Sequence, residues 1–294
     1  MTNKTISFAL FGKAFALQQA DAIKQVLHHL EARNATVVVE EQYFQHLQTQ
    51  LGKLPEQFTA FNVQDFKTDF AISLGGDGTL LTAASRVAEK QTPIIGINMG
   101  RLGFLADIAP DEFPHILECI YNGNVHTEQH TAIQIQTQGQ PIAGIPYALN
   151  DIAILKRDHA SMISISASIN QNFVANYLAD GLIISTPTGS TAYNLSNGGP
   201  IMVSDTKNLC LTPVAPHSLT LRPIVVSDES IIDLTIQSRS HNYLVAIDGR
   251  SEPLHQTTRL RISKAPFSIN IVKRPDHQYF VTWRIFEKIN ANNK

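Results

Sequence analysis

The stretch Leu74-Gly75-Gly76-Asp77-Gly78-Thr79 combines glycines with one carboxylate at the end of an apolar, strand-like segment. Glycines there let the backbone turn sharply and approach an anion without a Cβ in the way. The free N–H groups of a following helix would point at that anion, and the helix dipole would favour it. We therefore expect a phosphate cradle with Gly75, Gly76, Gly78 and Thr79 as its binding residues. It is neither a Walker loop nor the dinucleotide fingerprint.

Asp77 is the unusual member of this cradle, because its carboxylate repels phosphate. Its presence there therefore favours a specific chemical function. It is a candidate to accept a proton from an attacking hydroxyl, or to hold a metal ion that offsets the phosphate charge. An aspartate at a helix start also serves simply as an N-cap or in an Asx-turn. The flanking glycines at a strand-to-helix junction favour a chemical role.

A second glycine-containing loop, Asn98 to Leu105, follows the next predicted strand. It should lie at the same carboxyl edge of the sheet, where open parallel sheets bind ligands. Arg101 in this loop either faces phosphate or stays a solvated surface side chain.

A third stretch, Ala179 to Tyr193, leads from a predicted strand into a turn dense in hydroxyls and glycine, and then into a predicted helix start. Hydroxyl groups and free helix N–H groups are suited to hydrogen bonding with sugar hydroxyls, and an aromatic side chain is suited to stacking on the face of a ligand ring. Clusters of Ser and Thr also cap helices and form turns, so both interpretations stay open.

The first 125 or so residues alternate strand and helix patterns, which predicts a parallel sheet covered on both faces. A helix is expected to end near Tyr121, with Gly123 as its C-cap. Strand-like segments lie at 6–12, 37–39, 70–74 and 93–97, and helical apolar spacing at 23–30, 80–88 and 111–121.

From about His126 the pattern changes to short β-rich runs separated by Gly, Pro, Asn or Asp. Met162 to Ile169 alternates apolar residues with serines, which indicates a half-buried strand. We expect an α/β domain over 1–125 and an all-β, sandwich-like domain over 126–278, while 279–294 either closes the β domain or returns to the first one. Further strands are expected at 152–155, 182–185, 224–226, 231–236, 243–247 and 267–272, with a single short helix near Ser190.

Composition excludes several classes of function. A net charge of −2 does not favour nucleic acid or an anionic membrane as a partner. No apolar run reaches the roughly 18 residues of a membrane helix, and neither a secretion signal nor a cysteine framework is visible, so a cytoplasmic protein is expected. The eleven histidines show no metal-ligand spacing, and no Gly-x-Ser-x-Gly nucleophile motif occurs.

Taken together, the motifs resemble those of the NAD kinase family. The glycine-aspartate motif alone is shared with diacylglycerol-type lipid kinases and phosphofructokinases, whereas Thr186 to Tyr193 separates the NAD kinases from them. The matching stretches span about 150 residues: 75–79, 100–107, Asn150-Asp151, 180–196, 198–200 and 216–219.

The resemblance implies a Rossmann-like first domain and transfer of the ATP γ-phosphoryl group to the 2′-hydroxyl of the adenosine ribose of NAD, giving NADP. It implies Asp77 as the proton acceptor, with Mg²⁺ or another divalent cation on the ATP phosphates. It also implies a homo-oligomer, dimer or tetramer, whose neighbouring subunits contribute to the site. The implied NAD-binding residues are Asp77, Gly78, Asn150, Asp151, Asp180, Thr191, Ala192, Tyr193, Asn194, Leu195, Ser196 and Arg250.

Three positions depart from the family pattern. Asp151 stands where the family has Glu, Arg250 stands where it has Gln, and Leu178 is apolar where some members are polar or charged. Two other functions remain open, a lipid or sugar kinase with the same glycine-aspartate loop and a non-catalytic NAD sensor. The kinase interpretation requires the Asp77 loop and the turn near Ser190 to face each other across one cleft.

Overall fold

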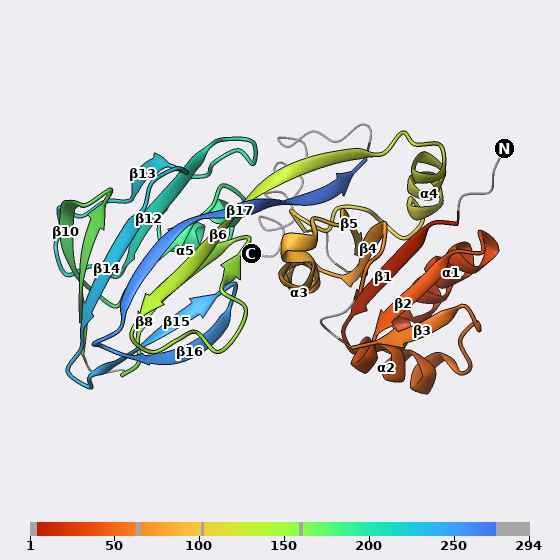
Figure 1. The fold of residues 1–294 in the computed structure, drawn as a ribbon, viewed down its shortest axis with the longest axis horizontal. Coiled ribbons are helices and arrows are strands. Elements are labelled where there is room, and N and C mark those ends of the chain that lie inside the picture. The colour runs from red at the N-terminus through yellow and green to blue at the C-terminus, as the bar shows by residue number, and fades with distance from the viewer. Residues whose placement is uncertain (1–4, 63–65, 101–102, 159–160, 275–294) are drawn as a thin grey trace. The chain divides into compact units, whose positions relative to one another are not determined.

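The computed structural model describes residues 5–62, 66–100, 103–158 and 161–274 of the chain (Figure 1). Contacts divide them into two compact units, one formed by residues 5–129 with 269–274 and the other by His130–Ser268. Two strands, β6 (His126–Gln138) and β17 (Arg259–Lys273), carry the chain across the boundary. The segment 279–294 lies outside the described residues, and where it packs stays a prediction.

The first unit is built on a parallel sheet with the order β17-β5-β4-β1-β2-β3. The end of β17 returns to this unit, where Ile271 and Val272 pair with β5. The chain thus adds its last described strand to a sheet begun by its first. The other strands are β1 (Ser7–Gly12), β2 (Thr36–Glu40), β3 (Phe58–Phe61), β4 (Phe70–Gly75) and β5 (Ile94–Asn98).

Three helices share one apolar cluster with alternate strand residues such as Phe8 and Leu10. Successive side chains of a strand point to opposite faces, so these helices cover one face of the sheet. They are α1 (Ala20–Ala32), α2 (Glu41–Leu51) and α4 (Phe113–Tyr121), with two short 3-10 turns, η1 (Leu17–Gln19) and η2 (Ala88–Lys90), elsewhere in the unit.

The fourth helix, α3 (Asp77–Val87), packs on the other face, against β4 and β5. Ile95 and Ile97 point into the cluster of the first face, so Gly96 between them points toward α3. A Cβ at Gly96 would lie 2.7 Å from Leu80, so only glycine lets α3 approach the sheet this closely. This packing holds the first turn of α3 at the carboxyl end of β4.

The second unit is an antiparallel β-sandwich. One sheet has the order β10-β9-β14-β17 with β6 and β7 beside it, and the other has the order β13-β12-β11-β8-β15-β16. Its strands are β7 (Tyr147–Ala148), β8 (Asp151–Lys156), β9 (Ile163–Ile169), β10 (Asn172–Ala179), β11 (Gly181–Ser185), β12 (Asn208–Val214), β13 (Ile224–Ser227), β14 (Ile232–Gln237), β15 (Asn242–Ile247) and β16 (Arg250–His255).

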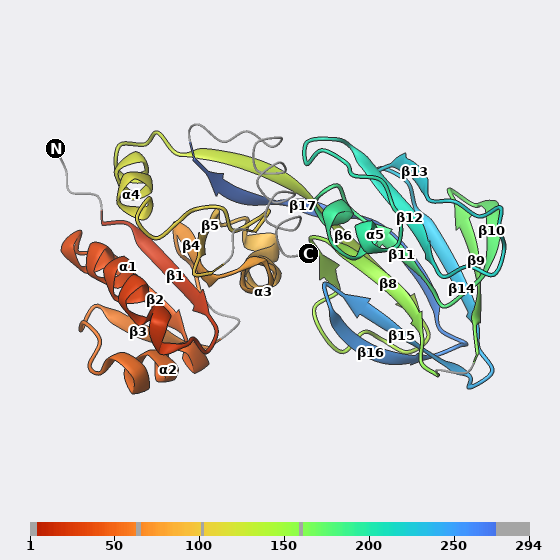
Figure 2. The ribbon, with the colours of Figure 1, turned by 180° about the vertical axis from the view of Figure 1, so that it is seen from behind.

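The core of the sandwich lies between its two sheets. Ile163 and Ile165 of β9 point inward and meet Ile152 and Ile154 of β8 in one buried cluster. On the outer face of the second sheet, η3 (Thr188–Thr191) and α5 (Tyr193–Ser196) lie against β11 and β12 (Figure 2). A turn that sequence analysis singled out is therefore anchored on a rigid sheet.

The predicted fold class is confirmed: a parallel sheet with helices is followed by an all-antiparallel β unit. The expected helix near Ser190 is also present, while the C-cap of α4 is Asn122 and the expected Gly123, with φ of 73°, is the residue that follows it. Sequence analysis did not identify α2, since only Tyr43 and Leu47 of its residues are buried and the rest are mostly polar. In the described ranges no helix is long and apolar enough to cross a bilayer.

Candidate active site

The glycine cradle lies where β4 ends at Gly75 and α3 begins at Asp77. A Cβ at Gly75 would lie 2.8 Å from the Cβ of Thr79, so this turn requires a glycine. Beside Gly76 the space is open, and near Gly78 the Nζ of Lys13 lies 3.9 Å from the position a Cβ would take. The first turn of α3 is therefore accessible, with a cationic side chain nearby that sequence analysis did not identify.

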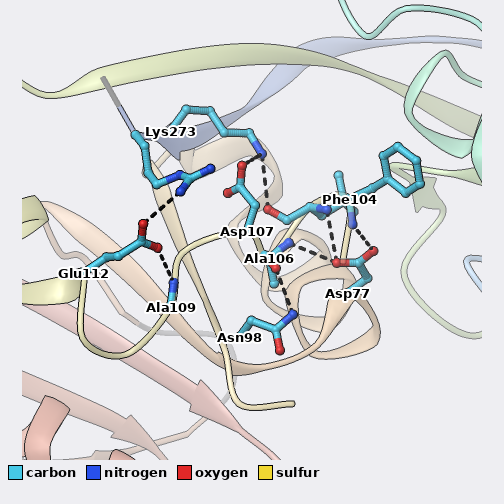
Figure 3. Close-up of polar contacts among 10 residues, drawn as sticks. Asp77, Asn98, Phe104, Ala106, Asp107, Ala109, Glu112 and Lys273 are labelled. Atoms are coloured by element: carbon cyan, nitrogen blue, oxygen red, sulfur yellow. Dashed lines mark hydrogen bonds and ion pairs between the residues drawn. The ribbon is translucent and has the colours of Figure 1, made fainter. Parts of the chain in front are cut away.

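The Asp77 carboxylate is held by the second glycine loop (Figure 3). Its Oδ2 accepts a hydrogen bond from the N–H of Phe104 at 2.9 Å, and its Oδ1 accepts from Leu105 at 3.1 Å and Ala106 at 2.9 Å. Consecutive N–H groups arranged in this way form a concave site for an anion. A Cβ at Gly103 would overlap the carboxylate, which explains the glycine there.

The loop that supplies these N–H groups is fixed by Asn98 at the end of β5. The Asn98 side chain donates to the carbonyl of Ala106 at 3.0 Å and accepts from the N–H of Gly100 at 2.7 Å. Its backbone N–H donates to the carbonyl of Ile108 at 2.8 Å. The parallel neighbours β4 and β5 thus bring both glycine loops to one sheet edge, as predicted. Arg101 lies outside the described residues.

A buried ion pair ties the same loop to the end of β17 (Figure 3). Lys273 Nζ lies 3.2 Å from Asp107 Oδ2, and both side chains are 2% exposed. Lys273 also donates to the carbonyl of Leu105 at 3.3 Å. Next to it, Arg274 pairs with Glu112 at 2.8 Å, and Glu112 accepts from the N–H of Ala109 at 2.7 Å.

In the second unit, Asn150 and Asp151 stand at the start of β8, against the hydroxyl-rich turn. Thr186 donates its hydroxyl to the carbonyl of Leu149 at 2.5 Å and its N–H to that of Asn150 at 2.9 Å. A Cβ at Gly189 would overlap the Asn150 carbonyl. The structure therefore brings Asn150 and Asp151 together with the turn that follows β11.

The interior of this turn is held by a buried hydrogen-bond network. Ser190 donates its hydroxyl to the carbonyl of Pro187 at 2.6 Å and accepts from the N–H of Met202 at 2.9 Å. Asn194 donates to the carbonyls of Ser190 and Pro200, each at 3.1 Å, and accepts from the hydroxyl of Thr212 at 2.6 Å. The Asn194 side chain thus shapes the turn from within.

The remaining members of the turn face outward to different extents. Tyr193 is 39% exposed and Leu195 is 40% exposed. Ser196 is exposed as well, while Thr191 and Ala192 are half-buried. An aromatic ring, an apolar side chain and a hydroxyl are therefore available to a ligand on one short turn.

Asp180 is not part of this group. It precedes β11, whereas the turn follows β11, and five residues of strand separate them by about 17 Å. The Asp180 carboxylate pairs with Lys156 at 2.7 Å. Within one chain, therefore, Asp180 and Asn150 lie at opposite ends of the same strand pair.

Arg250 and its neighbour Asp248 contact main-chain atoms. The Arg250 guanidinium donates to the carbonyls of Ile247, Ile145 and Tyr147. The Asp248 carboxylate accepts from the N–H groups of residues 149–151. Burial and the Asp248 charge raise the pKa of Asp151 to about 7.

Two family models match the chain: the ATP-NAD kinase N-terminal domain over residues 8–125, and the ATP-NAD kinase C-terminal domain over residues 149–274. The chain belongs to the NAD kinase family. The resemblance inferred from the motifs is thus confirmed, and both glycine loops, the Asn150-Asp151 pair and the hydroxyl-rich turn lie within the matched ranges.

Relatives in the NAD kinase family cover nearly the whole chain. The NAD kinase of Bacteroides fragilis is 47% identical over 279 residues, which are 95% of this chain and 96% of the relative. The NAD kinase of Porphyromonas gingivalis is 36% identical over 276 residues, which are 94% of this chain and 95% of the relative.

Two solved structures have the same fold. An NAD kinase from Archaeoglobus fulgidus in complex with ATP aligns with a TM-score of 0.73 at 26% identity, covering 97% of this chain and 99% of that one. Yeast NADH kinase complexed with NADH aligns with a TM-score of 0.86 at 22% identity, covering 99% of this chain and 89% of that one.

The buried ion pair behind the Asp77 loop yields a stability prediction. Replacing Lys273 with Met leaves the buried Asp107 carboxylate without this cation, so the free energy of unfolding should fall by about 3–5 kcal/mol. Urea titration followed by circular dichroism measures the change.

The matched control for Lys273→Met is Arg261→Met. That substitution removes the cation of the exposed Asp233 pair and should leave the unfolding midpoint nearly unchanged. Adding Asp107→Asn to Lys273→Met should recover part of the lost stability, because the buried negative charge is then removed together with its cation. A Lys273→Met protein as stable as the wild type would contradict the role of the ion pair.

Proposed function

We propose that this chain transfers the γ-phosphoryl group of ATP to the 2′-hydroxyl of the adenosine ribose of NAD, forming NADP. The observation that carries the proposal is the Asp77 carboxylate, held by three backbone N–H groups beside an open glycine cradle. The ATP phosphates bind at Gly75, Gly76, Gly78 and Thr79, where the N–H groups and dipole of α3 favour an anion.

Asp77 orients the ribose hydroxyl and accepts its proton. A secondary alcohol is a weak nucleophile, but phosphoryl transfer has a loose transition state that rewards alignment more than strong basicity. As the bond from the 2′-oxygen to the γ-phosphorus forms, the bond to the β,γ-bridging oxygen breaks and ADP leaves with that electron pair. A carboxylate has about four lone-pair positions, so the three N–H groups leave one for the hydroxyl.

A divalent cation such as Mg²⁺ fits this site as a partner of ATP. In the parts of the chain that the structure describes, no three His, Cys, Asp or Glu side chains gather to hold a metal ion. Mg²⁺ commonly binds through substrate phosphates and water with only one or two carboxylates. When bound, it would neutralise phosphate charge, while the chain contributes the glycine cradle and the placement of Asp77.

The acceptor NAD is bound by Asn150 and Asp151 together with the turn that follows β11. Carboxylate and amide side chains suit ribose hydroxyls, and the exposed ring of Tyr193 suits an aromatic ring face. Asn194 contributes indirectly, because the hydrogen bonds of its side chain fix the shape of the turn. The other proposed contacts are Gly78, Thr191, Ala192, Leu195 and Ser196.

Asp180 serves the NAD site of a neighbouring subunit, so we also propose a homo-oligomer, a dimer or a tetramer. This is supported by the position of Asp180 at the far end of β11 from the turn, a span of about 17 Å. A symmetric oligomer repeats each contact, so Asp180 of every subunit would lie in the NAD site of a neighbour. Because ATP and NAD are metabolites of the cell interior, the proposal includes a cytoplasmic location.

The direct test is to incubate the pure protein with NAD, ATP and Mg²⁺ and to assay NADP. Under these conditions Asp77→Asn should lower kcat by at least ~10²-fold, because proton acceptance is lost. NAD binding, measured by calorimetry, should stay largely intact. Near-normal turnover by Asp77→Asn would remove Asp77 from the mechanism, and phosphorylation of a lipid or sugar instead of NAD would overturn the proposed acceptor.

Mixed oligomers test the proposed sharing of Asp180. Asp77→Asn and Asp180→Ala proteins should each be nearly inactive as pure oligomers. After co-refolding in equal amounts, random dimers should regain about a quarter of wild-type activity, since half are mixed and each mixed dimer has one intact site. No regain in oligomers shown by mass spectrometry to be mixed would place Asp180 in its own subunit's site, and an active pure Asp180→Ala protein would place it outside any site.

A further inference from the structure

The hairpin between β15 and β16 consists of only two residues, Asp248 and Gly249. Both have positive φ, 46° and 78°, as in the type I′ turns that suit such hairpins. Asp-Gly is a favoured pair for this turn, so the hairpin explains the residue types. It does not explain why the carboxylate and the following guanidinium both point at another segment.

The Asp248 carboxylate holds the main chain that leads into β8. Its Oδ2 accepts from the N–H of Leu149 at 2.7 Å, and its Oδ1 accepts from Asn150 at 2.8 Å and Asp151 at 3.1 Å. The Asp248 N–H in turn donates to the carbonyl of Asp151 at 3.1 Å. Four hydrogen bonds therefore fix the backbone of residues 149–151.

Arg250 holds the same segment a few residues earlier, through carbonyl oxygens. Its guanidinium donates to the carbonyls of Tyr147 at 2.9 Å, Ile247 at 3.1 Å and Ile145 at 3.4 Å. One hairpin thus binds N–H groups with a carboxylate and C=O groups with a guanidinium. Charged partners make these hydrogen bonds stronger than neutral ones.

The Asn150 side chain of the held pair has an acceptor atom that the described residues around it leave unsatisfied. The Asn150 Oδ1 is buried and accepts no hydrogen bond within the part of the chain that the structure describes. The Asp151 side chain lies at the same place and is 7% exposed. Buried polar atoms in proteins are normally paired, so an unpaired one beside a fixed backbone indicates a missing hydrogen-bond partner.

We propose that Asp248 and Arg250 are positioning residues of the acceptor site, holding segment 145–151 so that Asn150 and Asp151 meet the hydroxyl groups of NAD. The inference rests on the proposed binding of NAD by that pair. It also gives Arg250 a different role from the direct NAD contact implied by the family resemblance, because its guanidinium is engaged by three carbonyls.

Because Asp248 is charged, its positioning role can be tested by the pH dependence of NAD binding as well as by protein stability. Burial and Asp248 raise the pKa of Asp151 to about 7. Burial raises the pKa of Asp248 as well, whereas its three N–H donors and Arg250 lower it. The neighbouring strands present uncharged groups at this point: Ser185 of β11 is opposite Asp151, and β15 ends at Ile247. Removing the Asp248 charge therefore acts directly on Asp151.

The experiment compares wild type, Asp248→Asn and Asp248→Gly. Both replacements tolerate positive φ, so the hairpin is preserved. Asn puts an NH₂ group where an acceptor oxygen stood, and Gly removes the carboxylate. We expect KM for NAD to rise about 10-fold in both variants, with KM for ATP unchanged and kcat within about 3-fold, because only the acceptor contacts are misplaced.

The pH dependence supplies a second readout. In the wild type, KM for NAD should change around pH 7 as Asp151 ionises. In Asp248→Asn this change should move to lower pH, because the neighbouring negative charge is gone. A matched control is Asp233→Asn, which removes a carboxylate paired with Arg261 outside the proposed site and should alter neither KM nor its pH profile.

Each outcome separates the role of Asp248 from the proposed function. A wild-type protein that forms no NADP overturns the function itself. Wild-type turnover with unchanged KM for NAD in both folded variants overturns the positioning role. Loss of kcat alone, with unchanged KM values and an unmoved pH profile, shows only a general structural defect and also overturns it.

Discussion

Three consecutive backbone N–H groups directed at one aspartate are the arrangement on which the candidate site residues of each unit depend. In the first unit residues 104–106 surround Asp77, and in the second residues 149–151 surround Asp248. A carboxylate bound in this way is fixed in position, and the loop that binds it takes its shape from the carboxylate. The hydrogen bonds to the carboxylate thereby fix the conformation of loops that lack the regular backbone hydrogen bonds of a helix or sheet.

The surroundings of Asp77 and Asp248 differ, and this difference is consistent with the different roles proposed for the two carboxylates. Asp77 begins a helix beside open space at Gly76, with a lysine near Gly78. Asp248 is half-buried, lies in a two-residue hairpin, and is followed closely by Arg250, whose charge lowers the Asp248 pKa that burial raises. The first carboxylate lies beside open space at the start of a helix, whereas the second lies against the main chain that leads into β8. In the functions proposed here, the same local geometry serves a reacting group in one unit and a positioning residue in the other.

Local patterns made much of this protein predictable. The strand-to-helix glycine loop, the alternation in β9 and the order of strands and helices gave the fold class, and the motifs gave the family, both of which are confirmed. Contacts between residues far apart in sequence were not predictable. Nothing near Asp77 in sequence reveals residues 104–106, and nothing near Asp107 reveals Lys273. The separation of Asp180 from the turn could have been inferred, since β11 was predicted and strand length follows from residue count.

The return of β17 to the first unit has a consequence for synthesis of the chain. Until residues 269–274 leave the ribosome, β5 is an unpaired sheet edge, and the Asp77 loop lacks Lys273 behind it. Unpaired edges are prone to wrong association in nascent chains. The first 129 residues are therefore not a module that can be expressed alone in its final form, because their sheet gains its last strand only after residues 269–274 have been synthesised.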